Sequence, residues 1–167
     1  MAYRNKTYVA FDADSDIRYY RLMTAWKQND NTTFNFYDAH DLNNIWELSN
    51  EQTIKRRLRE RMGNSKIFVI LIGERTKFLY KFVRYEIQIA LNLNLPIIAV
   101  NLNGRRSQDD NLCPALLRNN FALHVSFNAR IIQKALEQWE QYHYQFQKEK
   151  KTGPFYYNDE VYSNLGL

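Results

Sequence analysis

A carboxylate on an apolar helix face is the feature of this sequence best suited to chemistry. In "KFVRYEIQIALNLNLPIIAVN", residues 81–101, apolar positions follow helical spacing before a strand pattern begins. The apolar face comprises Phe82, Val83, Ile89, Ala90 and Leu93, and the opposite face comprises Lys81, Arg84, Gln88 and Asn92. Glu86 projects into the middle of the apolar face. Periodicity alone leaves three roles open for Glu86: a structural ion pair with a buried arginine, an edge position that reaches solvent, or a pocket carboxylate.

Acidic and polar residues also follow two predicted strands. Asp12, Asp14 and Asp16 form an acidic turn that suits either a cation or the start of a helix. The glycine and distal glutamate of an EF-hand loop are absent, so we predict a turn with Ser15 as the helix cap and no metal site. The segment Asp38-Ala39-His40 follows the second strand and is typical of a turn at the edge of a possible pocket.

A cluster of positive charge lies in "KRRLRERM", residues 55–62. It could bind nucleic acid, but Ile54, Leu58 and Met62 give this segment an ordinary inward stripe. No nucleic-acid-binding motif accompanies the cluster. We therefore interpret it as a solvated helix face and expect no nucleic-acid partner.

Strand and helix patterns alternate along the chain. Strands are predicted at residues 6–11, 33–37, 66–73, 96–101 and 121–127, the last as an edge strand; helices are predicted at 16–28, 51–62, 82–93 and 128–149. The alternation predicts an α/β fold: one three-layer domain with a five-stranded parallel sheet in the flavodoxin-like order 2-1-3-4-5. The domain should span residues 1–150. The aromatic tail, residues 151–167, should pack on this domain or at a self-association surface.

The predicted topology gathers the candidate residues at one edge of the sheet. Ligands of such folds bind at the carboxyl ends of the strands beside the switch point, here strands one and three. Those ends are Phe11-Asp12 and Ile72-Gly73, with Asp38-Ala39-His40 beside them. Glu86 lies early in the following helix, so we expect it to face the same crevice. On pattern alone, Phe11 and Phe82 are core aromatics.

Composition narrows the class of protein. The 167 residues are 45% apolar and carry a net charge of +5, which fits a folded domain that could attract a polyanion such as a dinucleotide. Cys113 is the single cysteine, which excludes an intrachain disulfide and favours a reducing compartment. No apolar run has the length of a signal peptide or a membrane span. The sequence thus predicts a cytoplasmic protein without a membrane partner.

Several segments resemble the Toll/interleukin-1 receptor (TIR) fold, and more closely the TIR-like domain family of the bacterial anti-phage Thoeris protein ThsB. The resemblance covers about residues 6–104, in the family's order. The matching pieces are "YVAFDADSD", "FNFYDAHDL", "IKRRLRERMGNSKIFVILIGERT" and "FVRYEIQIALNLNLPIIAVNLNG". Phe82 stands where the family often has Trp, and the second-strand loop lacks the Pro-Gly of many receptor-type TIR domains.

The resemblance implies an NAD+ glycohydrolase or cyclase in which Glu86 is the catalytic carboxylate. It implies substrate contacts from Phe11, Asp12, Asp38, Ala39, His40, Gly73 and Phe82. NAD+ would be the substrate, with no metal or other cofactor. The expected partners are a downstream effector that binds the nucleotide product and, in a homo-oligomer, further copies of this chain. The product could be ADP-ribose, a cyclic isomer or a conjugate.

Two other functions remain open at this point. Many TIR domains only assemble, so a non-catalytic interaction module in signalling is the main alternative. A nucleotide-sensing flavodoxin-like domain is a third. The inward position of Glu86 favours the enzyme over the interaction module, whereas the basic helix at residues 55–62 would matter more for the module.

Overall fold

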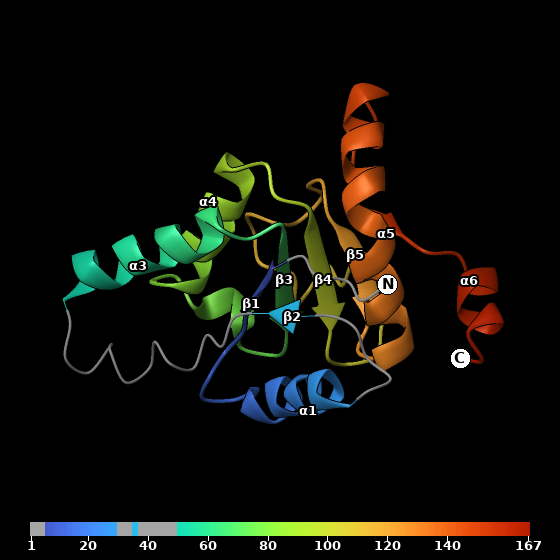
Figure 1. Ribbon diagram of the computed structural model, residues 1–167, viewed down its shortest axis with the longest axis horizontal. Helices are drawn as coiled ribbons and strands as arrows, with labels where there is room; N and C mark the ends of the chain where they lie inside the picture. Colours follow the sequence, from blue (N-terminus) through green and yellow to red (C-terminus); the bar gives the residue numbers. More distant parts are fainter. Residues whose placement is uncertain (1–5, 30–34, 37–49) are drawn as a thin grey trace.

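The computed structural model describes residues 6–29, 35–36 and 50–167, which form a parallel sheet covered by helices (Figure 1). The strand order is β2-β1-β3-β4-β5-β6. The strands span Lys6–Ala10 (β1), Asn35–Phe36 (β2), Ile67–Ile72 (β3), Ile97–Asn101 (β4), Leu123–Ser126 (β5) and Phe155–Tyr156 (β6). The predicted parallel sheet in the order 2-1-3-4-5 is confirmed, and β6 extends it by one short strand.

Strand β3 lies at the centre because its sequence has no polar face. All six of its residues, IFVILI, are buried. Val69 pairs with Val9 of β1 on one side and with Ile98 of β4 on the other. A strand flanked and covered in this way exposes no side chain to water, which is why its apolar run is continuous and not alternating.

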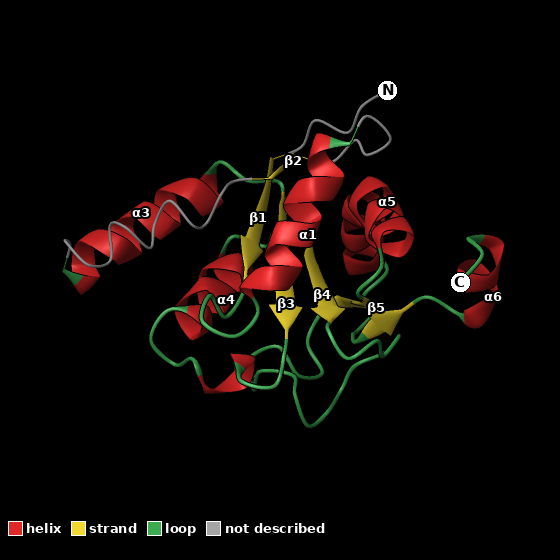
Figure 2. Cartoon of the chain, turned by 90° about the horizontal axis from the view of Figure 1, so that it is seen from below, coloured by secondary structure: helices red, strands yellow, loops and turns green. Residues whose placement is uncertain are grey.

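The helices form one layer on each face of the sheet. Helices α3 (Glu51–Gly63) and α4 (Val83–Asn92) cover the face that carries Tyr8 and Phe68. Helices α1 (Ile17–Gln28) and α5 (Ala129–Lys148) cover the face that carries Val9 and Val69. Figures 1 and 2 show α3 and α4 together on one side of the strands and α5 on the other. Alternate side chains along β1 and β3 therefore pack into two separate hydrophobic cores, one on each face of the sheet.

Local signals explain where two helices begin. The Asn50 side chain accepts a hydrogen bond of 2.9 Å from the N–H of Thr53, which caps α3. The predicted cap of α1 by Ser15 is wrong: the helix follows Asp16, whose side chain makes no capping bond. The carboxylate of Asp12 instead receives the N–H groups of that turn, at 3.0 Å from Asp14 and 3.4 Å from Ser15.

One position on the α4 face differs from its prediction. Leu93, predicted on the apolar face, is 46% exposed. Helix α4 ends at Asn92, so Leu93 is its C-cap, and Asn94 then takes a positive φ of 52°. The chain turns away before another helical residue can point inward, and Leu95 enters the core in place of Leu93.

The segment after α5 forms the last strand and helix of the fold. Strand β6 pairs with β5 in parallel, so the prediction that residues 121–127 lie at the sheet edge is wrong. Helix α6 (Asp159–Asn164) follows β6 and buries Tyr162 completely. Among the described residues, no helix is long and apolar enough to cross a membrane.

Candidate functional site

A cavity of about 610 Å³ opens at the carboxyl end of β1, beside the start of α4. Two segments line it: the turn after β1, and the connection from the short helix η2 (Thr76–Phe78) into α4. Its lining residues are Phe11, Asp12, Ala13, Asp14, Phe78, Leu79, Tyr80, Lys81, Phe82, Val83 and Glu86. In Figure 2 the arrowheads of β1, β3 and β4 point towards the side where these connections gather. The position agrees with the ligand crevice of doubly wound folds.

Glu86 lies in the first turn of α4 and is only 5% exposed. Its backbone N–H donates to the carbonyl of Phe82 at 2.8 Å, which holds the residue in helical geometry. Its neighbours along the helix, Val83 and Ile87, belong to the apolar core. The helix thus inserts a carboxylate where an apolar side chain would be expected, at the helix end that favours negative charge.

Burial raises the pKa of the Glu86 carboxyl to about 7, against a smaller lowering effect of the neighbouring Tyr8 hydroxyl. Tyr8 comes from β1, and its hydroxyl has no well-aligned hydrogen-bond partner in the described part of the chain. We therefore regard the two groups as close neighbours that are not joined by a properly formed hydrogen bond. Burial and the charge of Glu86 raise the pKa of Tyr8 in turn.

The structure also bears on the ion-pair alternative for Glu86. Within residues 6–29, 35–36 and 50–167, no lysine or arginine forms an ion pair with Glu86. No positive charge contributes to the shift of its pKa. A buried carboxylate is normally paired, because an uncompensated charge is costly to bury. Among the described residues, Glu86 is therefore a buried carboxylate that lines a cavity and has no ion-pair partner.

Aromatic and acidic side chains form part of the remaining cavity wall. Phe11 lines the cavity and stacks on Tyr20 of α1, with 4.6 Å between ring centroids. Phe82, half-buried, lines the cavity close to Glu86 in the sequence. Asp12 is buried, and its second carboxylate oxygen, Oδ2, has no hydrogen-bond partner among the described residues. The cavity thus combines aromatic surfaces with two buried carboxylates.

Gly73 does not line the cavity that contains Glu86. It lines a neighbouring cavity of about 300 Å³ together with Asp16 and Glu74. Its N–H donates to the Thr76 hydroxyl at 2.9 Å. A Cβ at position 73 would lie 2.4 Å from Asp16 Oδ2, so the absence of a side chain lets Asp16 approach the strand end.

The structure brings together Phe11, Asp12, Phe82 and Glu86, and the predicted residues Asp38, Ala39 and His40 lie outside the described residues. Sequence reasoning missed the wall formed by residues 78–81, which carries no motif. It also missed Tyr8. Strand alternation could have found Tyr8, because Tyr8 and Ala10 share the sheet face that α4 covers.

The described residues contain no group of three or more His, Cys, Asp or Glu side chains placed to hold a metal ion. Asp12 acts within its own turn and Asp16 packs against Gly73. The acidic turn therefore shapes the backbone between β1 and α1.

A comparison with protein families matches this chain over residues 8–107. The matching family model is described as the TIR-like domain of the Thoeris protein ThsB. The match covers more than half of the 167 residues and runs from β1 past the end of β4. It includes every described residue of the cavity around Glu86.

Proposed function

Because the chain belongs to the TIR-like domain family of Thoeris ThsB, we propose that it is an enzyme that cleaves the nicotinamide–ribose bond of NAD+ during anti-phage defence. The observation that carries the proposal is the Glu86 carboxylate, buried at the wall of a 610 Å³ cavity without an ion-pair partner among the described residues. That volume lies within the usual range of ligand-binding cavities.

The reaction requires few catalytic groups from the protein. When the bond between ribose C1′ and the nicotinamide nitrogen breaks, its electron pair leaves with nicotinamide, which becomes neutral. The ribose is left with oxocarbenium-like positive charge, as in glycoside hydrolysis. The ionised Glu86 carboxylate stabilises that developing charge through space and accepts hydrogen bonds from the ribose hydroxyls. The leaving group needs no proton, so a second carboxylic acid is not required.

The environment of Glu86 suits this role. A pKa of about 7 leaves roughly half of the carboxyl ionised at neutral pH, and the cationic nicotinamide ring of bound NAD+ favours the ionised form. Because the Glu86 side chain is buried, its attraction to the transition state is weakened little by water. Phe11 and Phe82 supply aromatic surface for the nicotinamide ring.

The acceptor of the ribosyl group then sets the product. Water gives ADP-ribose, a nitrogen or hydroxyl of the same molecule gives a cyclic isomer, and a foreign nucleophile gives a conjugate. We propose that the product is released as a signal and that a downstream effector binds it. Asp12 lines the same cavity and is the second residue that we assign to substrate binding.

Incubation of the purified protein with NAD+, followed by mass spectrometry, tests the proposal. We expect free nicotinamide and one ADP-ribose-derived product. Glu86→Gln keeps the shape of the side chain but removes its charge, so the rate should fall at least about a hundredfold, equivalent to about 3 kcal/mol of transition-state stabilisation.

Glu60→Gln is a matched control, because Glu60 is an exposed residue of α3 that does not line the cavity. It should cleave NAD+ at the wild-type rate. Reactions supplemented with extract from phage-infected cells would supply an activating factor. Equal NAD+ cleavage by wild type and Glu86→Gln would contradict the assignment, as would an absence of cleavage with and without that extract.

A further inference from the structure

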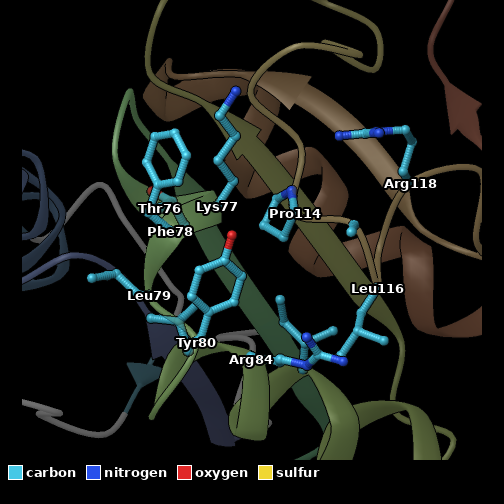
Figure 3. A pocket seen from close by; sticks show the side chains of 12 residues that line it. Thr76, Lys77, Phe78, Leu79, Tyr80, Arg84, Pro114, Leu116 and Arg118 are labelled. Atoms are coloured by element: carbon cyan, nitrogen blue, oxygen red, sulfur yellow. The ribbon is translucent and has the colours of Figure 1, made fainter.

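A second cavity, of about 230 Å³, lies on the other side of the connection between η2 and α4. Figure 3 shows that three segments surround it: the chain from Thr76 to Tyr80, the first turns of α4, and the turn from Pro114 to Arg118. Its apolar lining is formed by Leu79, Val83, Ile87, Pro114, Ala115 and Leu116. Neither Glu86 nor Asp12 lines it, so it is a separate site from the candidate active site.

The charge around this cavity has one sign. Lys77, Arg84 and Arg118 line it, and none of its described lining residues is acidic. The Arg84 side chain makes no hydrogen bond or ion pair with any residue that the structure describes. Arg118 donates from one guanidinium nitrogen to the carbonyl of Cys113 at 3.1 Å, which leaves its other donors available. A guanidinium group with available donors can bind two oxygens of one phosphate.

Two aromatic side chains accompany these charges. Tyr80 is 65% exposed and Phe78 is 58% exposed, and both line the cavity. In Figure 3 the ring of Tyr80 stands between Lys77 and Arg84, with its hydroxyl turned towards the space between the segments. Exposed aromatic rings next to cationic groups offer stacking surface to a planar ring that carries an anion.

We propose that this cavity binds a nucleoside monophosphate, with the phosphate held by Arg84 and the base stacked on the aromatic wall. The apolar lining accommodates the base and sugar, which carry no charge. The cavity is smaller than the one around Glu86, 230 against 610 Å³, and therefore suits a mononucleotide better than a dinucleotide. This inference does not depend on NAD+ cleavage.

Titration calorimetry with AMP as the probe tests the proposal. Wild type should bind AMP more tightly than it binds adenosine or inorganic phosphate, each of which lacks half of the recognised chemistry. Arg84→Gln should weaken AMP binding by at least about tenfold, because it loses a charge-assisted contact to phosphate. Arg118→Gln removes a second positive charge from the lining and should weaken AMP binding less. Arg84→Lys keeps the charge but not the paired donors, and should fall between wild type and Arg84→Gln.

Two control variants test whether AMP binds at this cavity and not elsewhere on the protein. Arg59→Gln removes the same charge from an exposed position on α3 and should leave AMP affinity within about twofold of wild type, since a distant surface charge is screened by salt. Glu86→Gln should also leave AMP affinity unchanged. An absence of AMP binding, an equal loss in Arg59→Gln, or a loss in Glu86→Gln with full binding by Arg84→Gln would each overturn the proposal.

Discussion

At the scale of single residues, the candidate active site contains buried carboxylates that destabilise the folded protein. Glu86 is a buried carboxylate without an ion-pair partner in the described chain, and Asp12 carries a buried oxygen without a hydrogen-bond partner there. Groups of this kind are costly in a structural core and common where a ligand completes their environment. Gly73 lies in close contact with the Asp16 carboxylate, and a substitution at Gly73 can test how much this contact contributes to stability.

Gly73→Ala should lower the free energy of unfolding by about 1–3 kcal/mol, because its Cβ would lie 2.4 Å from Asp16 Oδ2 and the buried carboxylate would have to move. Urea denaturation measures the change. Adding Asp16→Ala to Gly73→Ala should remove this clash, so the two substitutions should couple by about 1 kcal/mol or more in a double-mutant cycle.

Gly63→Ala is the matched control for Gly73→Ala. A Cβ at position 63 would meet no atom within 4 Å, and Gly63 ends α3. This change should be neutral or stabilise the protein by up to about 1 kcal/mol, since alanine favours the helix. Additive effects of Gly73→Ala and Asp16→Ala would show that the proposed clash does not decide the stability at this position.

At the scale of elements, the connection between η2 and α4 decides the arrangement of both cavities. Phe78, Leu79, Tyr80 and Val83 line both of them. This connection therefore separates the candidate active site from the cationic cavity. At the far edge of the sheet, the chain after α5 forms a different unit, in which Phe155 packs against Phe121 with 4.7 Å between ring centroids.

Tyr162 anchors this C-terminal unit. It is fully buried, and its hydroxyl accepts a hydrogen bond of 3.2 Å from the N–H of Ser126 in β5. Tyr162→Ala should lower the free energy of unfolding by about 3 kcal/mol, because it leaves a cavity against the sheet. Tyr162→Phe keeps the ring and should cost only about 1 kcal/mol, from the lost hydrogen bond. Chemical denaturation measures both values.

Tyr156 provides the comparison for Tyr162, because it belongs to β6 but its side chain is exposed. Tyr156→Ala should change the free energy of unfolding by less than about 0.5 kcal/mol, as is usual for surface positions. Truncation after Lys151 removes β6 and α6 together and should cost more than Tyr162→Ala. A truncated protein as stable as wild type would mean that the contacts of the tail contribute nothing.

At the scale of the whole molecule, two apolar cores on opposite faces of the sheet support the fold, and Glu86 adjoins one of them. Folding raises the pKa of this carboxyl from its ordinary value of 4.5 to about 7. A carboxyl with a raised pKa binds its proton more tightly in the folded state than in the unfolded state. The stability that this proton provides is fully present below pH 4.5 and is lost as pH rises to 7 and above.

Glu86→Gln should therefore stabilise the protein in alkaline but not in acidic solution. At pH 8 the free energy of unfolding should rise by up to about 3 kcal/mol relative to wild type, and the difference should shrink towards zero at about pH 4.5. Melting curves of both proteins across this pH range measure the effect. A Glu86→Gln protein that is less stable than wild type in alkaline solution would instead indicate a structural ion pair.

Features that depend on local periodicity could be predicted from the sequence. The continuous apolar run of β3 predicted a central strand, and the helical spacing after residue 81 placed Glu86 on an inward face. The β–α alternation then predicted the parallel order of the first five strands, because few topologies satisfy short, right-handed connections. These signals lie within a few residues of one another, so no knowledge of distant contacts is needed to read them.

Contacts between residues that are distant in the sequence could not be predicted in this way. The turn after β1 and the connection after η2 form a cavity beside Glu86. In the described chain, no cationic side chain forms an ion pair with this residue. Gly73 follows its strand as predicted but faces Asp16 in another cavity. The aromatic tail pairs with β5, about 30 residues earlier in the chain. Such contacts depend on how whole elements pack. The side-chain pattern within one segment does not predict which other segment will pack against it.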